Sequence, residues 1–200
     1  MHLFKNIKNS YVRKNNHSLF GRIDCDMICS FSKINPFSDW GGIELLDSKL
    51  FSDIISELRI EDYVLQTEVL FVNPGMCIPI HNDQDIGTFS IGIGIKNSEH
   101  FYMLEIDKKY NDESDKHLLN VPLIASKKRT ANVPRYTNMS DGIKLVEKIY
   151  QQKSIIGDDA LLSNTKNYHT AANYGEKTAW MISFRLNEKF DYEQYLSYTK

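Results

Sequence analysis

The sequence predicts a mainly β domain whose antiparallel strands close as a barrel or a double-sheet jelly roll. Three observations support this fold class. From Val64 onward, short runs of branched and aromatic residues are separated by turn residues. Within residues 89–95, Phe and Ile alternate strictly with Ser and Gly, which is typical of a strand with two different faces. The 200-residue length and 42% hydrophobic content suit a single domain, residues 1–200, with its own core.

The segment before the strands is expected to contain one helix. Residues 1–20 are polar and weakly patterned, so we expect an arm or an irregular edge there. Asp47 can cap a helix that runs to Leu58, because apolar residues follow it at helical spacing. These apolar residues are Leu50, Ile54, Ile55 and Leu58.

The β core is expected at about residues 64–187. Its first strand ends at Asn73-Pro74-Gly75, which is a strong turn signal. The Ser and Gly face of the 89–95 strand has two interpretations, the wall of a cavity or close packing against a neighbouring element. The expected strands are 64–72, 79–83, 89–95, 101–106, 121–125, 159–165 and 178–186.

Residues 107–157 form a long insertion in this core. Residues 107–120 are highly charged and polar, which indicates a loop. A helix is expected from Ser140 to Gln152, with Ser140 as its cap and Ile143 and Val146 in its apolar stripe. Long irregular connections near a site are usually functional, so the insertion is a candidate lid. The last dozen residues are expected to form a short helix.

Composition and charge exclude several classes of protein. The net charge of −2 gives no global attraction to nucleic acid or to an anionic membrane. The basic run at 127–129 is better explained as a solvated loop. Three cysteines, at 25, 29 and 77, are too few for a disulfide framework or a complete zinc site. No secretory leader or membrane span is visible, so we expect a soluble cytoplasmic protein.

His81-Asn82-Asp83 and the distant His169 carry the chemical signal of the chain. Residues i and i+2 of a strand point to the same face, so His81 and Asp83 can bind one metal ion while Asn82 points away. His169 must arrive from another strand. Two imidazoles and one carboxylate are the ligand set of non-haem iron(II) sites, and they leave coordination positions open for reactants.

Arg185 is the second unusual residue. In the strand 178–186 it shares a face with Ala179, Met181 and Ser183, opposite the apolar face. An Arg inside a small barrel needs an anionic partner, and its planar fork suits a carboxylate. Lys177 and Lys189 remain alternatives as anion ligands, but both lie outside the central stretch of the strand.

On these residues the chain resembles the iron(II)- and 2-oxoglutarate-dependent oxygenases. Their pattern is a His-x-Asp or His-x-Glu pair, a distal His and a basic residue on the last barrel strand. The match covers roughly residues 64–187. In motif and order, the segments 74–83 and 157–185 look like the compact members related to aspartyl/asparaginyl β-hydroxylases.

The resemblance implies a double-stranded β-helix, the jelly-roll fold of cupins, and a role for each motif residue. The catalytic centre would be Fe(II) held by His81, Asp83 and His169, with dioxygen at an open position. Arg185 would bind the distal carboxylate of the cosubstrate 2-oxoglutarate, with Ser183 as a second donor. Three further residues are candidates for cosubstrate contact, and the choice among them stays open: Gln66, Thr67 and Asn164.

The implied function is a dioxygenase, an oxidoreductase that hydroxylates a C–H bond, with desaturation, cyclisation and demethylation as variations. The expected partner is a small-molecule or peptide substrate, such as an amino acid or a natural-product intermediate. Nucleic acid is disfavoured by the charge, and the oligomeric state is not readable. Two other interpretations keep the barrel: a cupin-type isomerase or hydrolase with Zn, Mn or Ni, and a non-catalytic jelly-roll binding module.

Overall fold

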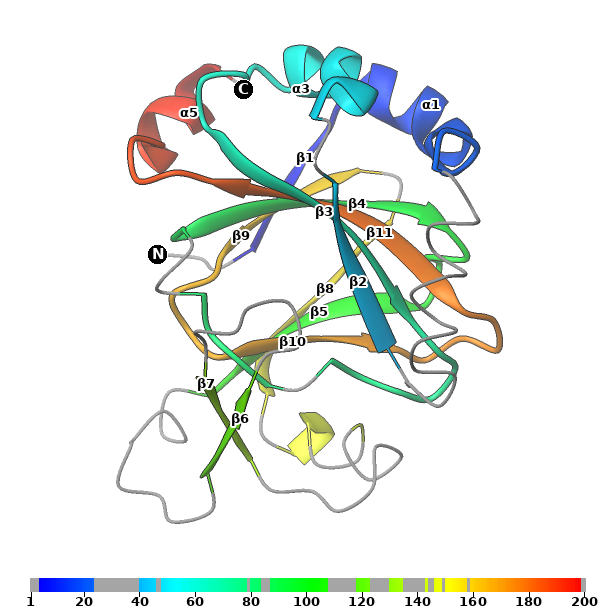
Figure 1. The fold of residues 1–200 in the computed structure, drawn as a ribbon, viewed down its shortest axis with the longest axis vertical. Coiled ribbons are helices and arrows are strands. Elements are labelled where there is room, and N and C mark those ends of the chain that lie inside the picture. Colours follow the sequence, from blue (N-terminus) through cyan, green and yellow to red (C-terminus); the bar gives the residue numbers. More distant parts are fainter. Residues whose placement is uncertain are drawn as a thin grey trace.

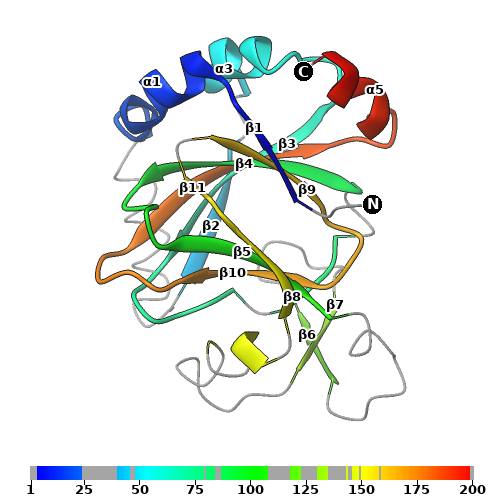
Figure 2. The ribbon, with the colours of Figure 1, turned by 180° about the vertical axis from the view of Figure 1, so that it is seen from behind.

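Two antiparallel sheets face each other, and helices cover the outer face of the larger one (Figures 1 and 2). The structure is a computed structural model. The residues that it describes are 4–23, 40–45, 48–78, 80–83, 87–107, 118–122, 130–134, 143, 146–148, 150–157 and 159–198.

The larger sheet has six strands in the order β1-β9-β4-β11-β3-β2. All of its neighbouring strands pair antiparallel. In spatial order the strands are β1 (Phe4–Ile7), β9 (Ala160–Asn164), β4 (Phe89–Lys96), β11 (Ala179–Leu186), β3 (Val64–Val72) and β2 (Trp40–Leu45).

The smaller sheet has three strands, and the chain crosses to it twice. Its order is β10 (His169–Asn173), β5 (Phe101–Ile106) and β8 (Tyr150–Ile155). The chain passes from β4 to β5 and from β9 to β10, so consecutive strands lie in opposite sheets. A hairpin of β6 (Leu118–Pro122) and β7 (Thr130–Pro134) lies beyond this sheet, on the side away from the helices (Figures 1 and 2).

These observations confirm the expected fold class in its general form, a mainly β chain with antiparallel sheets and few helices. The precise double-stranded β-helix stays a prediction. Predicted strands 64–72 and 101–106 match β3 and β5 residue for residue, and the predicted C-terminal helix is α5 (Tyr192–Tyr198). The predicted helix 47–58 is present as η1 (Ser48–Phe51) and α3 (Ser52–Glu57).

The main apolar core lies between the larger sheet and the helices. The alternating strand β4 supplies Phe89, Ile91, Ile93 and Ile95 to it, all buried, as the sequence predicted for its apolar face. A second core, which includes Leu161 and Met181, fills the space between the two sheets. The face of β4 that carries Ser90, Gly92 and Gly94 therefore looks inward, toward the smaller sheet.

The N-terminal prediction was wrong for the described residues, because Phe4–Ile7 form a strand and Ser10–Phe20 form a helix. Strand β1 pairs with β9, and helix α1 (Ser10–Phe20) packs on the larger sheet. Asn9 caps the helix by accepting hydrogen bonds from the backbone N–H groups of Tyr11 and Val12. Few apolar residues mark the helix, but Val12 and Leu19 are fully buried and fix its orientation.

The predicted helix 140–152 was wrong at its C-terminal end. Residues 146–148 are helical, but Tyr150–Ile155 is strand β8, which pairs with β5. Pairing with a preformed strand overrides local helical preference there. The rest of that helix lies outside the described residues apart from Ile143, which is helical.

Two other predictions around the insertion have mixed outcomes. The expected strand 121–125 overlaps β6, although residues 123–125 lie outside the described residues. Leu118–Pro122 replaces the end of the expected 107–120 loop. A lid role for 107–157 stays a prediction, since much of that segment is not described.

The described residues contain no helix long and apolar enough to cross a membrane. Cys77 is buried and forms no disulfide within the described part of the chain, whereas Cys25 and Cys29 lie outside the described residues.

The glycine face of β4 is closely packed rather than a cavity wall. A Cβ atom at Gly94 would lie 2.5 Å from the backbone oxygen of Ile156, and one at Gly92 would lie 2.8 Å from the Met181 methyl carbon. The close-packing interpretation of these glycines is therefore the one that holds.

We expect Gly94→Ala to lower the free energy of unfolding by about 2 kcal/mol, because the new methyl group would lie 2.5 Å from the backbone oxygen of Ile156, which cannot rotate away. Gly157→Ala is the matched control: its Cβ would meet nothing closer than 3.8 Å, so a change within about 0.5 kcal/mol is expected. Urea unfolding measures both, and equal effects would contradict the packing explanation.

Candidate metal centre

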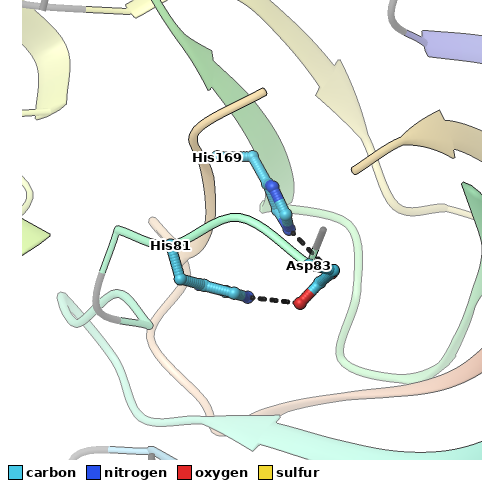
Figure 3. Close-up of side chains that lie close together, drawn as sticks. All are labelled: His81, Asp83 and His169. Carbon is cyan, nitrogen blue, oxygen red and sulfur yellow. Dashed lines mark ion pairs between the residues drawn. The ribbon is translucent and has the colours of Figure 1, made fainter. Parts of the chain in front are cut away.

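Three side chains from two distant segments converge between the sheets. His81 and Asp83 lie on the connection from β3 to β4, and His169 is the first residue of β10. One potential ligand atom from each lies within 4.8 Å of the others. The His81 Nε2 atom is 3.8 Å from Asp83 Oδ1, and the His169 Nε2 atom is 3.5 Å from Asp83 Oδ2 (Figure 3). The sequence-predicted ligand set is therefore assembled in space.

The backbone positions these ligands without a regular strand at 79–83. That predicted strand is not formed: His81 makes an isolated antiparallel bridge with His169, and Pro79 lies outside the described residues. The bridge consists of two reciprocal N–H···O bonds, 3.0 Å from His81 to His169 and 2.8 Å in the other direction. The Asp83 N–H donates to the Thr165 carbonyl at 2.9 Å, so each ligand residue is tied to the segment leading into β10.

The tautomer of His169 is set by its neighbours. Its Nδ1 atom lies 2.9 Å from the Asn167 carbonyl oxygen, which can only accept, so Nδ1 carries the proton. The Nε2 lone pair then faces Asp83, where a metal ion would bind. Asn167 is held in turn, because its side-chain amide donates to Glu105 Oε1 at 2.9 Å. Glu105 lies directly opposite His169 in the β5–β10 register.

The electrostatics of the centre favour the protonation states that bind metal. Burial, with help from His81 and Arg185, lowers the pKa of His169 to about 4, so its imidazole is neutral at ordinary pH. Burial alone would raise the pKa of Asp83, but Arg185 and the two imidazoles outweigh it and hold that pKa below its usual range. Neutral imidazoles and an ionised carboxylate are the forms that ligate a metal.

The residues fit a divalent transition metal. Two imidazole nitrogens and one carboxylate oxygen form the donor set typical of open non-haem iron(II) sites. Asp83 Oδ2 is buried and accepts no well-aligned hydrogen bond from the described residues, although the His169 imidazole and the Arg185 guanidinium lie beside it. A buried carboxylate oxygen in that state has capacity for a metal ion.

Arg185 lies beside the triad, between two carboxylates. Its Nη1 group contacts Asp83 Oδ2, and its Nε–H donates to Glu68 Oε2 at 3.1 Å. Burial would lower the pKa of Arg185, but Asp83 and Glu68 outweigh it and raise that pKa. The inward-facing Arg185 thus has two anionic partners, Asp83 and Glu68, where the sequence predicted at least one.

The other predicted site residues divide between the two faces of the larger sheet. Ser183 is buried on the inner face, opposite Glu68 on β3 and Gly92 on β4. Gln66 is opposite Arg185 and donates to Glu68 at 2.8 Å. Thr67 and Asn164 alternate to the outer face, shared with the core residues Val69 and Leu162, so the structure does not bring them to the triad. The Asn164 side chain instead accepts from the Lys166 N–H at 3.1 Å.

The sequence did not assign roles to Glu68, Glu105 and Asn167. Glu105 carried the clearest signal, because it is a charged residue in an otherwise apolar strand, Phe101–Ile106. Glu68 shares its strand face with Gln66, but only the register places it beside Arg185. Asn167 acts mainly through its backbone carbonyl, which has no signature in the sequence.

Comparisons with known proteins give low-level structural likenesses only. No family model matches the chain, and no curated protein matches it. It is similar to HygX from Streptomyces hygroscopicus, solved with nickel and 2-oxoglutarate bound, at 13% identity, a TM-score of 0.49, and coverage of 94% of this chain and 83% of that one. The non-heme alpha ketoglutarate dependent carbocyclase SnoK from nogalamycin biosynthesis matches at 12% identity and a TM-score of 0.49, with 92% and 79% coverage.

A further likeness is to AviO1 from Streptomyces viridochromogenes Tue57, at 10% identity, a TM-score of 0.44, and coverage of 94% of this chain and 90% of that one. Likenesses at these identities and TM-scores do not assign a function to the chain.

We expect Glu105→Leu to weaken metal binding about 10- to 100-fold, because the Asn167 amide loses its acceptor and the Asn167 carbonyl then holds His169 less firmly. Glu105→Gln keeps a side-chain carbonyl for that amide and should bind metal nearly as the parent does. Ni(II) titration measures the affinity, with thermal unfolding as the folding control. Parent-like Ni(II) affinity in Glu105→Leu would show that the relay does not position the ligand.

We also expect the metal-free protein to lose stability as the pH falls from 6.5 to 4. The unfolded chain protonates His169 below pH 6.5, whereas the folded chain keeps it neutral to about 4, so protons bind preferentially to the unfolded state. This single group accounts for about 3 kcal/mol over that range. Urea unfolding at several pH values should show a shallower loss in His169→Gln, and an unchanged slope would contradict the assignment.

Proposed function

We propose that the chain is an Fe(II)- and 2-oxoglutarate-dependent dioxygenase that oxidises, most simply by hydroxylation, a C–H bond of a small substrate. One observation carries the proposal: the facial set of His81, Asp83 and His169 lies in direct contact with the buried cation Arg185. A metal centre alone fits many reactions. A metal centre with an adjacent buried guanidinium fits a cosubstrate that has one end on the metal and a carboxylate at the other.

Each residue of the centre has a defined task in this proposal. His81, Asp83 and His169 would hold the metal, and a set of three protein ligands would leave coordination positions open for reactants. When bound, iron with 2-oxoglutarate and dioxygen supplies the oxidising chemistry, with succinate and carbon dioxide as the coproducts. The protein contributes orientation, charge and exclusion of water. Burial of all three ligand side chains favours that exclusion.

Arg185 is the proposed ligand of the distal carboxylate. A metal ion held by Asp83 would compete with Arg185 for that carboxylate, and metal binding would therefore release part of the guanidinium. Its contacts with Asp83 and Glu68 are made through Nη1 and Nε, respectively. Ser183, two residues earlier on the same buried face, is the proposed second donor. Asn164, on the outer face, is not assigned a part.

The substrate in this proposal is an amino acid, a short peptide or a natural-product intermediate. The ligand residues are 9% exposed or less, so a reactant has to enter the space between the sheets. That geometry suits a small molecule or a narrow chain better than a large folded partner.

The test is to incubate anaerobically purified protein with Fe(II), 2-oxoglutarate and air, and to measure succinate. We expect succinate above the protein-free background in the parent. His81→Ala should lose metal binding and succinate together, because one of three ligands is gone.

Arg185→Ala should keep metal binding but need about 10- to 100-fold more 2-oxoglutarate, because a charge-assisted hydrogen-bond pair is lost. Metal titration of the same sample shows that the variant is folded. Absence of both metal binding and succinate in the parent would sink the proposal. An unchanged 2-oxoglutarate requirement in Arg185→Ala would remove only the role of that residue.

A further inference from the structure

Glu68 is a buried carboxylate that the proposed reaction does not use. It is 7% exposed and lies on the inner face of β3. Its Oε1 accepts from the Gln66 amide at 2.8 Å, and its Oε2 accepts from Arg185 Nε at 3.1 Å. Burying a carboxylate is costly unless a cation or several donors compensate it. The cost of burying Glu68 therefore indicates a role beyond packing.

Among Arg185, Asp83 and Glu68, one of the two carboxylates is in excess as a counter-ion. Asp83 already supplies one negative charge to the single positive charge of Arg185. Glu68 adds a second, so the three residues together carry one excess negative charge. A divalent metal adds two positive charges and 2-oxoglutarate adds two negative charges. The loaded site thus again has one excess negative charge, which a cation would balance.

A second buried polar group lies on the same face of the sheet, three strands away from Glu68. The Ser163 hydroxyl is 2% exposed and has no hydrogen-bond partner among the described residues. Ser163 is opposite Ser90, and Ser90 is opposite Arg185, which is opposite Gln66. One row of the sheet therefore carries four polar residues toward the interior, next to the row of Ser183 and Glu68. A buried hydroxyl left unsatisfied there is the state expected of a group that meets a bound molecule.

We propose that Glu68 binds a cationic group of the primary substrate, a protonated amine, and that Arg185 masks Glu68 until the cosubstrate binds. This inference rests on the proposed function. The carboxylate of 2-oxoglutarate draws the Arg185 guanidinium toward itself, and the Glu68 carboxylate then loses part of its cation partner. The exposed charge inside the site attracts an ammonium group. The consequence is an order of binding, with the cosubstrate first and the amine second.

The first measurement is cosubstrate affinity of the Ni(II)-loaded protein by calorimetric titration with 2-oxoglutarate. Glu68→Gln keeps an oxygen acceptor for Arg185 but removes the charge that competes with the cosubstrate. We expect it to bind 2-oxoglutarate about tenfold more tightly than the parent.

Glu44→Gln is the matched control for this measurement. Glu44 is directly opposite Glu68 in the β2–β3 register, is exposed, and makes no ion pair with Arg185 among the described residues. The Glu44→Gln variant removes one negative charge from the same row of the sheet but leaves the Arg185–Glu68 contact in place. Its 2-oxoglutarate affinity should therefore stay within about twofold of the parent.

The second measurement is binding of 1,5-diaminopentane, with 1,5-pentanediol and glutarate as matched neutral and acidic probes. We expect the diamine to bind the Ni(II)- and 2-oxoglutarate-loaded parent at least tenfold more tightly than either matched probe, and to bind poorly when 2-oxoglutarate is left out. Glu68→Gln should lose that preference while Glu44→Gln keeps it. The probe comparison in the parent stands even where the variant does not fold.

The outcomes separate this inference from the function on which it rests. Failure of 2-oxoglutarate to bind the metal-loaded parent would overturn the proposed function and the masking of Glu68 with it. Binding of 2-oxoglutarate that Glu68→Gln does not strengthen, or equal binding of the diamine, the diol and glutarate, would overturn the Glu68 assignment alone.

Discussion

The reciprocal backbone hydrogen bonds between His81 and His169 are the constraint on which the metal centre depends. The two residues are far apart in the sequence, and each has its side chain aimed at Asp83. A pair of N–H···O bonds in antiparallel geometry fixes both the separation and the relative rotation of the two chains. The backbone pairing therefore directs both imidazoles toward the Asp83 carboxylate. The remaining parts of the site, including the Asn167 and Glu105 contacts, refine a geometry that this bridge sets.

The space between the two sheets has an apolar part and a polar part. Away from the triad, apolar side chains such as Leu161 and Met181 fill the space between the sheets, and Gly94 is pressed against backbone of the chain. Around the triad the same inward face carries Arg185, Glu68 and serine hydroxyl groups. Buried charges of this kind are poor stabilisers, because desolvation offsets much of their attraction. We therefore expect most of the stability to come from the apolar part of the interior and from the core under the helices.

Local sequence pattern predicted the clustering of His81, Asp83 and His169 well and the edges of the fold poorly. The spacing in His81-Asn82-Asp83, the isolated His169 and the inward-facing Arg185 were readable because side-chain alternation is a local property of strands. Strands β3 and β5 were readable for the same reason. Strand β8 was not, since its residues become a strand only through pairing with β5. The role of Glu68 also depends on register, because nothing near it in the sequence says that Arg185 is its neighbour.

The contact between Asp83 and Arg185 links the candidate metal ligands to the proposed anion-binding residue. One carboxylate oxygen is close to both the His169 Nε2 atom and a guanidinium, so a metal ion held by Asp83 would change what Arg185 can bind. Glu68 is a further competitor for Arg185, because it accepts a hydrogen bond from the Nε group of the same guanidinium. A single buried cation shared among two carboxylates and an incoming anion cannot satisfy all of them at once. That competition is a physical basis for ordered binding, and it needs only side chains that change partners while the sheets stay fixed.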